Sequence, residues 1–577
     1  MRNHETLKIA LVLALAALTP SVAHAVGETN GRIAGTVTEA QTGAPVPGAT
    51  VTAAGPALIG APRTVTTGDD GRYEIVELPP GRYEVEVSYS GVKPIKRRVI
   101  VRQGELLPLD IQWSAELAET EVTVVVEERH MTKPDSTQQG TVISADTESK
   151  IASARDYQAV ALQVAGTVDS SDAAGNPLIK GGNWLMNHWL VDGLDISDAV
   201  LGSFSSNINF DSIASVEVIT GGMEAQYNSL GGVINLITAG GSDEWHIDSS
   251  LYINNRAFSA AAQYGPQTYN GVRDYSRIKP GPTQGYQANI NVSGPIVKHR
   301  LWFNFSAEYD FTQASTPAGP PLNIQAPPDT RNTLLLRLKL TWAPNEKHRI
   351  TLSASADPEF IQNADQGNAG NSELPIAQAY QKQGGTFAIL AWDWFINQNM
   401  NTNVQTGFQW SFIDAGPEGF FTKPDIGSES KMFGPLNQMY NPDQPRHVNQ
   451  VDGTVWYNNS AAQYDDRYTF QFDPSLSLRG HLLGYHDAKF GIQSRYVYHS
   501  VFVKTPGDKT YFDNFNPAAP PPLNGGNLES GVCNETTGTN CSAIQTSPPY
   551  SQHQQGFSIG AFLQDRWKPI KRLTIVP

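Results

Sequence analysis

The amino-acid sequence predicts a mainly β protein whose larger part is the first half of an antiparallel transmembrane β-barrel. Residues 244–577 alternate apolar and polar side chains with a period of two, which is the period of a β-strand. Short connections alternate with long ones, and a membrane barrel has this pattern because its turns and its loops lie on opposite sides. Segments of about ten residues suit a tilted crossing of the bilayer. The short connections are 295–299, 343–347, 397–401, 480–485 and 568–571.

Four of the alternating segments predict which side chains face lipid. Each has one apolar and one polar face, as expected for a wall between lipid and a polar interior. A soluble β-rich domain with half-buried strands also alternates, but it rarely separates short from long connections so strictly. The predicted apolar faces are Leu301, Phe303, Phe305, Ala307, Tyr309 and Phe311; Leu334, Leu336, Leu338, Leu340 and Trp342; Val404, Thr406, Phe408, Trp410 and Phe412; and Tyr468, Phe470, Phe472, Leu476 and Leu478.

Charge and apolar runs exclude other classes of protein. The 577 residues have a formal net charge of -15 and no run rich in Lys and Arg, which argues against a nucleic-acid-binding protein. No apolar run reaches the roughly 18 residues of a spanning helix, so a membrane protein with this sequence has to cross as a barrel.

Residues 1–25 have the features of an export signal. Arg2 and Lys8 precede an apolar core, and Ala23-His24-Ala25 provides a small-x-small cleavage site. The two cysteines, Cys533 and Cys541, lie close together in one long loop and are a candidate disulfide, which would stabilise by roughly 2–3 kcal/mol. A pair of free thiols is the alternative.

Residues 26–118 predict a small β-sandwich. Turn sequences such as Thr66–Tyr73 and Leu78–Tyr83 each lead into alternating residues. These motifs resemble the carboxypeptidase regulatory-like domain, which has a prealbumin-like fold similar to starch-binding domains. The resemblance implies an accessory role in folding or adhesion, with carbohydrate binding possible by analogy. We expect Tyr73, Tyr83 and Tyr89 to be core residues.

Residues 119–140 predict a linker that contains one β-prone run. Such a run beside a polar stretch can add itself as a strand to the sheet of another protein. The alternative is that it forms the last strand of the preceding domain. The run is Glu121, Val122, Thr123, Val124, Val125 and Val126.

Residues 141–243 predict a mixed α/β unit. Ser149–Val164 has one apolar helical face, and Asp192-Gly193 between apolar residues predicts a hairpin turn. The stretches from Ile213 to Gly222 and from Tyr227 to Thr238 resemble the plug domain of TonB-dependent outer-membrane receptors, closest to the Oar-like group. The motif residues are Lys180, Gly181, Gly182, Asn183, Asp192, Gly193, Gly221, Gly222, Gly231, Gly232 and Asn235.

The resemblance to these receptors implies a location, partners and a mechanism. In the family the plug sits inside a barrel of twenty-two strands in the outer membrane of a Gram-negative bacterium, with the N-terminal domain in the periplasm. A short segment before the plug, the TonB box, pairs with TonB, which its inner-membrane proteins energise. By position, Glu121–Val126 is the candidate box. The motif glycines are expected to permit tight turns and close backbone approach.

Ten wall strands can be counted, and Leu573–Val576 starts another. Ten strands would leave two open edges, so we expect the sequence to be a fragment, the front part of a longer protein.

The sequence offers no pair of residues for catalysis. Gly556–Gly560 matches the nucleophile-elbow pattern but continues as a strand, and the histidines are scattered. We therefore expect no enzyme, cofactor or metal site. The leading hypothesis is a receptor that imports a sugar, peptide or metal chelate. The alternative is an adhesion or matrix-binding protein anchored in outer-membrane lipid by its barrel.

Overall fold

A computed structural model describes residues 31–576, with gaps at 114–138, 145–154, 259–266, 275–282, 315–327, 365–378, 417–445 and 514–540 and shorter gaps of one to five residues. Within these described ranges, no helix is both long and apolar enough to cross a membrane.

Residues 31–113 form a β-sandwich of two four-stranded sheets around one apolar core. One sheet has the order β4-β1-β7, with β8 also paired to β1, and the other has the order β3-β2-β5-β6. Tyr73 and Tyr83 are buried in the core and Tyr89 packs against it, as predicted. The strands are β1 (Gly31–Glu39), β2 (Thr50–Ala54), β3 (Arg63–Thr66), β4 (Arg72–Leu78), β5 (Gly81–Ser88), β6 (Ile95–Val101), β7 (Leu106–Pro108) and β8 (Ile111–Trp113).

Residues 139–243 form a second unit, which we call the plug. Its five-stranded sheet has the order β13-β12-β15-β14-β9, in which β12 is parallel to β15. Trp189, Tyr157 and Phe204 pack against one another in its core. The predicted helix over Ser149–Val164 ends earlier, at Ala161. The elements are β9 (Gln139–Ser144), α3 (Tyr157–Ala161), β10 (Thr167–Asp169), β11 (Pro177–Ile179), η3 (Trp184–Met186), β12 (His188–Val191), β13 (Leu194–Asp195), η4 (Phe210–Ser212), β14 (Ile213–Gly221) and β15 (Val233–Thr238).

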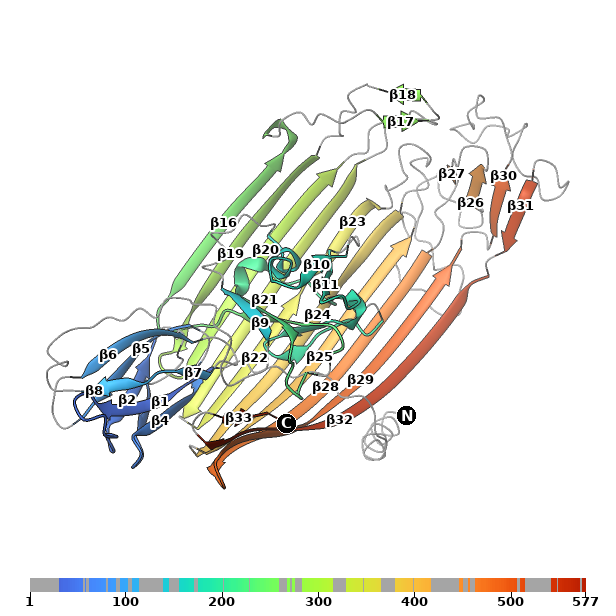
Figure 1. The fold of residues 1–577 in the computed structure, drawn as a ribbon. Coiled ribbons are helices and arrows are strands. Elements are labelled where there is room, and N and C mark those ends of the chain that lie inside the picture. The colour runs from blue at the N-terminus through green and yellow to red at the C-terminus, as the bar shows by residue number, and fades with distance from the viewer. Residues whose placement is uncertain are drawn as a thin grey trace, which may run out of the picture.

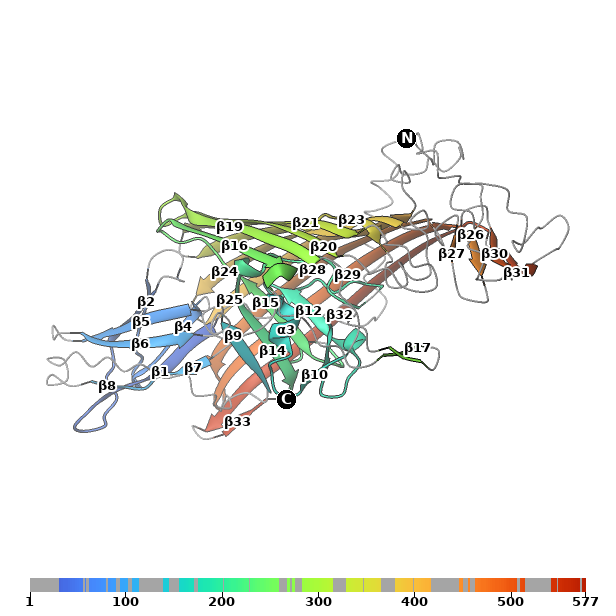
Figure 2. The ribbon, with the colours of Figure 1, turned by 90° about the horizontal axis from the view of Figure 1, so that it is seen from above.

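The remaining chain forms a twelve-stranded antiparallel sheet, the wall, which curves around the plug (Figures 1 and 2). Its strands follow chain order, and β23 joins β21 and β24 where β22 ends. Ten main strands and a short β33 agree with the predicted count. The strands are β16 (His246–Asn255), β19 (Thr283–Val297), β20 (Leu301–Ala314), β21 (Asp329–Asn345), β22 (His348–Ala356), β23 (Glu359–Ala364), β24 (Ala379–Asn397), β25 (Met400–Gly416), β28 (Ala462–His481), β29 (Tyr485–Lys504), β32 (Tyr550–Ile570) and β33 (Leu573–Ile575).

The two faces of the wall strands are those that the alternation predicts. The polar residues Glu308 and Arg337 point toward the plug and are each 2% exposed, whereas Phe470 and Phe472 point outward and are 50% and 52% exposed. Strand β24 departs from the pattern, because Phe387 is apolar, points inward and packs with Ile389 on the plug core. An apolar side chain is favourable on the inner face at this point because it meets apolar side chains of the plug.

Most wall strands are longer than the roughly ten residues expected for a crossing. Strand β21 has 17 residues, β28 has 20 and β32 has 21. On the loop side, backbone pairing continues into polar sequence, where apolar and polar residues no longer alternate and the sequence pattern no longer predicts a strand.

Loop segments also form strands: a hairpin of β17 (Gln267–Tyr269) and β18 (Val272–Asp274), and a sheet of β26 (Arg446–Asn449), β27 (Val455–Trp456), β30 (Lys509–Asp513) and β31 (Cys541–Thr546). The 3₁₀ turn η5 (Arg256–Phe258) follows β16.

Three predicted features lie wholly or partly outside the described residues. These are the export signal, the candidate TonB box Glu121–Val126 and Cys533. Cys541 begins β31. The disulfide and the box therefore stay predictions.

A lysine on the lipid face should cost most near the middle of the membrane. Phe305 lies on the outer face, between the Trp245–Phe303 pair on the turn side and the Tyr286–Phe311 stack on the loop side. We expect Phe305→Lys to lower the free energy of unfolding in lipid vesicles by about 2–4 kcal/mol, and Ile296→Lys at the turn end of β19 by about 0–1 kcal/mol. Urea titration of the full-length protein measures both. Equal losses would contradict this placement of the bilayer.

Candidate functional site: the contact between plug and wall

The hairpin β12–β13 and the residues after it carry three aspartates spaced three apart, Asp192, Asp195 and Asp198. Asp192 and Gly193 form the predicted two-residue turn, with φ of 48° and 89°. A type I′ turn requires positive φ at both positions, and Asp-Gly is a favoured sequence for it. The three aspartates are 8%, 0% and 5% exposed. Each buried carboxylate therefore needs partners, because an unpaired buried charge is costly.

The first aspartate is held by the plug and faces the wall. The backbone N and the Oγ1 of Thr238 donate to the Asp192 carboxylate at 3.0 and 2.6 Å. Its Oδ2 lies 3.0 Å from Nζ of Lys339 on β21. Burial alone would raise the pKa of Asp192, but the charges of Lys339 and Arg337 outweigh it and hold the pKa below its usual range. Asp192 is therefore ionised at neutral pH.

The second aspartate is fully buried between plug and wall. Its carboxylate accepts from the backbone N of Ser197 at 2.8 Å, and Nδ1 of His188 lies 3.0 Å away. Arg495 of β29 approaches to 3.2 Å through Nη1 and donates from Nη2 to the carbonyl oxygen of Ser197 at 2.6 Å. Burial would raise the pKa of Asp195, but His188 and Arg495 lower it well below the ordinary value.

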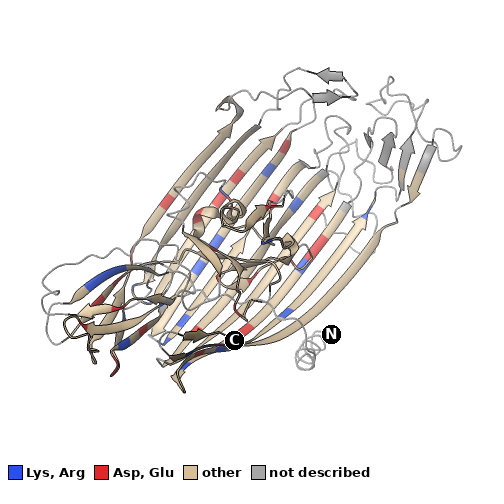
Figure 3. Ribbon diagram, viewed as in Figure 1, with Lys and Arg blue, Asp and Glu red and all other residues tan. Residues whose placement is uncertain are grey.

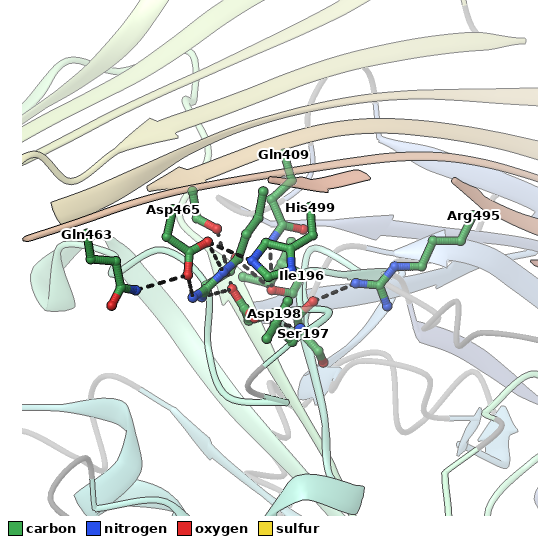
Figure 4. Close-up of polar contacts among 12 residues, drawn as sticks. Ile196, Ser197, Asp198, Gln409, Gln463, Asp465, Arg495 and His499 are labelled. Carbon is green, nitrogen blue, oxygen red and sulfur yellow. Dashed lines mark hydrogen bonds and ion pairs between the residues drawn. The ribbon is translucent and has the colours of Figure 1, made fainter. Parts of the chain in front are cut away.

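The third aspartate belongs to a cluster on the loop side of the second (Figure 4). Nη1 of Arg467 on β28 donates to Asp198 at 2.9 Å, while Nε and Nη2 of the same guanidinium donate to Asp465 at 3.0 and 2.6 Å. His499 of β29 lies 3.0 Å from Asp465. The guanidinium thus joins a plug carboxylate to a wall carboxylate.

Wall glutamines hold the backbone of the plug. Side-chain amides of Gln405 and Gln409 donate to the carbonyl oxygens of Asp192 and Ile196 at 3.3 and 3.2 Å. Gln471 donates to the carbonyl of Asp195, and Gln493 donates to that of Gln226 at 3.2 Å. These donors satisfy carbonyls of irregular buried backbone that would otherwise lose their hydrogen bonds to water.

The predicted motif residues lie in two groups at opposite ends of the parallel β12–β15 pair. At one end, Lys180–Asn183 pack beside Gly221–Gly222 and Gly231–Gly232. A Cβ on Gly232 would lie 2.2 Å from Cδ1 of Ile179, so only glycine fits there. At the other end, Asn235 accepts from the backbone N of Gly193 at 3.3 Å and supports the aspartate turn.

Sequence reasoning missed the charge partners of the wall. Charged residues of both signs lie along the strands beside the plug (Figure 3). Lys339 and Arg467 stand on the polar face already recognised in the sequence, and a charge that the plug buries against this face needs an opposite charge nearby. On the plug side, the regular spacing of Asp192, Asp195 and Asp198 was the sequence signal that could have indicated these charge partners. In the described parts of the chain, no group of three or more His, Cys, Asp or Glu is placed to hold a metal ion.

Two family models match the chain. Residues 32–114 match the carboxypeptidase regulatory-like domain, and residues 310–576 match an outer membrane beta barrel domain. The chain therefore contains a regulatory-like domain and an outer-membrane β-barrel domain, and the barrel domain places the protein in the outer membrane of a Gram-negative bacterium.

Comparison with known proteins identifies a particular relative. The chain is a homologue of the TonB-dependent transporter Oar of Myxococcus xanthus, 28% identical over 393 residues, which cover 60% of this chain and 35% of that transporter. The outer membrane transporter YddB of Escherichia coli has the same fold, with a TM-score of 0.52 and 9% identity over 74% of this chain and 54% of YddB. The chain thus spans between a third and about half of these relatives. The family resemblance predicted from the sequence is confirmed.

Removing the central carboxylate should loosen the plug. Asp195→Asn leaves Arg495 buried without its charge partner, which typically costs about 3–5 kcal/mol. Hydrogen exchange of the β12 and β15 amides, which reports local opening of the plug, should accelerate accordingly. Glu244→Gln, which neutralises an exposed acidic residue directly after the plug, is the matched control. Unchanged exchange in Asp195→Asn would mean that the ion pair does not hold the plug.

Acid should weaken the same contacts. Because the pKa values of Asp192 and Asp195 are lowered in the folded protein, their stabilisation is complete above the unfolded value of about 3.9 and is lost as pH falls below it. We expect the urea concentration at the midpoint of plug unfolding to decrease when the pH falls below about 4. The double variant Asp192→Asn with Asp195→Asn should show a weaker pH dependence, and an identical dependence would contradict the assignment.

Proposed function

We propose that this chain is part of an energy-coupled outer-membrane receptor that binds a ligand on its extracellular side and imports it to the periplasm. The observation that carries the proposal is the polar contact between plug and wall. Ion pairs and amide hydrogen bonds hold the plug against the inner face, and apolar packing of wall on plug is concentrated at Phe387 and Ile389. Water can replace such contacts at a net cost of roughly 0.5–1.5 kcal/mol for each neutral hydrogen bond and about 1.5–3 kcal/mol for each hydrogen bond to a charged group. A plug held in this way blocks the lumen at rest and can be displaced reversibly.

Homology to a protein described as a TonB-dependent transporter supports the same function. The partner in this proposal is TonB, energised by its inner-membrane proteins. The ligand is a sugar, a peptide or a metal chelate, and the protein is a carrier, not an enzyme.

The position of the candidate TonB box fits transmission of force to the plug. Glu121–Val126 lies in the sequence between β8, which ends at Trp113, and β9, which begins at Gln139. In the described structure β9 is the edge strand of the plug sheet and pairs with β14. A pull on the box therefore reaches β9 first. The contact from Nζ of Lys180 to the side chain of Gln139 lies at the point where this pull arrives.

Deleting Glu121–Val126 should abolish capture of the purified periplasmic domain of TonB, because strand addition needs an extended β-prone segment. Capture is measured with the full-length protein in detergent, and uptake in cells should be lost while ligand binding is kept. Deletion of Thr132–Gln138, a polar stretch of the same linker, is the control. Capture that survives the first deletion would place the box elsewhere.

A further inference from the structure

A row of charged side chains crosses the wall at its turn side. Arg479 on β28 pairs directly with Asp487 on β29, and Asp487 pairs directly with Arg566 on β32. The arginine side chains approach the Asp487 carboxylate to 3.5 and 3.9 Å. This row, which we call the rim row, lies two residues from the strand ends at the β28–β29 turn and four residues from the end of β32.

The N-terminal sandwich contacts the rim row at the turn end of the barrel wall. Arg32 on β1 lies 2.5 Å from Asp487, and Glu74 on β4 lies 3.8 Å from Arg479. The hydroxyl of Tyr485 donates to Glu74 at 2.7 Å. The views in Figures 1 and 2 both place the sandwich at the turn ends of the wall strands.

The plug reaches the same row from inside the barrel. Glu224, in the segment between β14 and β15, forms an ion pair with Arg566, and the backbone N of Ala225 donates to Gln564 of the same strand at 3.1 Å. Arg566 therefore lies between a carboxylate of the plug and the carboxylate that holds the sandwich.

The six charged side chains of the cluster are withdrawn from water. Three arginines face three carboxylates, and none of the six side chains is more than 22% exposed. Without Glu224 the cluster carries one excess positive charge. Arg566 then competes with Arg32 for Asp487, and like charges in a poorly solvated site repel strongly. The members are Arg32, Glu74, Glu224, Arg479, Asp487 and Arg566.

We infer that the turn-side rim is a docking surface for the N-terminal sandwich whose affinity depends on the plug, because Glu224 controls the charge available to Asp487. When the plug segment around Glu224 withdraws, the sandwich is released from the rim. This coupling goes beyond the proposed transport function, and its test needs neither a ligand nor TonB.

Charge substitution separates this coupling from simple loss of a contact. Glu224→Gln and Arg566→Gln break the same ion pair, but only Glu224→Gln leaves an unbalanced arginine. Glu224→Gln should therefore weaken docking by roughly 5- to 150-fold, the range of a typical coupling between sites. Arg566→Gln should leave docking intact, and Arg566→Gln added to Glu224→Gln should restore it.

Docking is measured in the full-length protein in lipid bilayers, from the distance distribution between spin labels at Thr66→Cys in the sandwich and Leu483→Cys in the β28–β29 turn. Both sites are exposed, and Cys533 and Cys541 are replaced by serine. A narrow distribution in the parent that broadens in Glu224→Gln and narrows again in the double variant supports the coupling. Asp198→Asn, which breaks a plug–wall ion pair remote from the rim, should stay narrow.

Two results would overturn the inference. A distribution in Glu224→Gln as narrow as the parent would show that the plug does not affect docking. Equal broadening in Glu224→Gln and Arg566→Gln would show that the two changes merely disturb the wall. Should Glu224→Gln fail to assemble, Glu224→Asp with its shorter side chain tests the same point, and an intermediate loss of docking is then expected.

Discussion

The plug stays inside the wall because buried carboxylates of the plug meet cations that project from the inner face of the barrel strands. This pairing depends on the alternation of the strands, since a register shift of one residue would turn Lys339, Arg467 and Arg495 toward lipid. It also depends on the hairpin β12–β13, whose turn presents the three aspartates to different wall strands. The wall glutamines then hold the backbone between these aspartates, so the loop is fixed both by its charges and by its carbonyls.

The wall could be predicted from the sequence in detail, because period-two alternation records which side of a strand faces lipid. It assigned Phe305 to the outer face and Glu308 to the inner face, and it located the turns. It could not locate the loop-side ends of the strands, where both faces are polar. It also missed the inward apolar side chain of Phe387, whose environment is supplied by the plug and not by its own strand.

The candidate site could be predicted only in its local parts. Asp192-Gly193 specifies its turn through the conformations that those two residues adopt, and Gly232 could be recognised as a site of close approach. The pairing of Asp195 with Arg495 joins residues 300 positions apart and has no local pattern. The same holds for Arg32 and Asp487, which bring the N-terminal sandwich to the rim although neither residue stands in a recognisable motif. Long-range charge pairs of this kind appear only when the elements are placed in space.

Conductance of the full-length protein in planar lipid bilayers tests most directly whether these charge pairs keep the plug seated. The three aspartates Asp192, Asp195 and Asp198 would be changed together to asparagine, which keeps their size and removes their charge. We expect the unaltered protein to stay closed and the variant to open intermittently, because the wall cations then lack partners and the plug shifts. A variant that stays as closed as the unaltered protein would contradict the account, since the plug would then be held by contacts other than these charges.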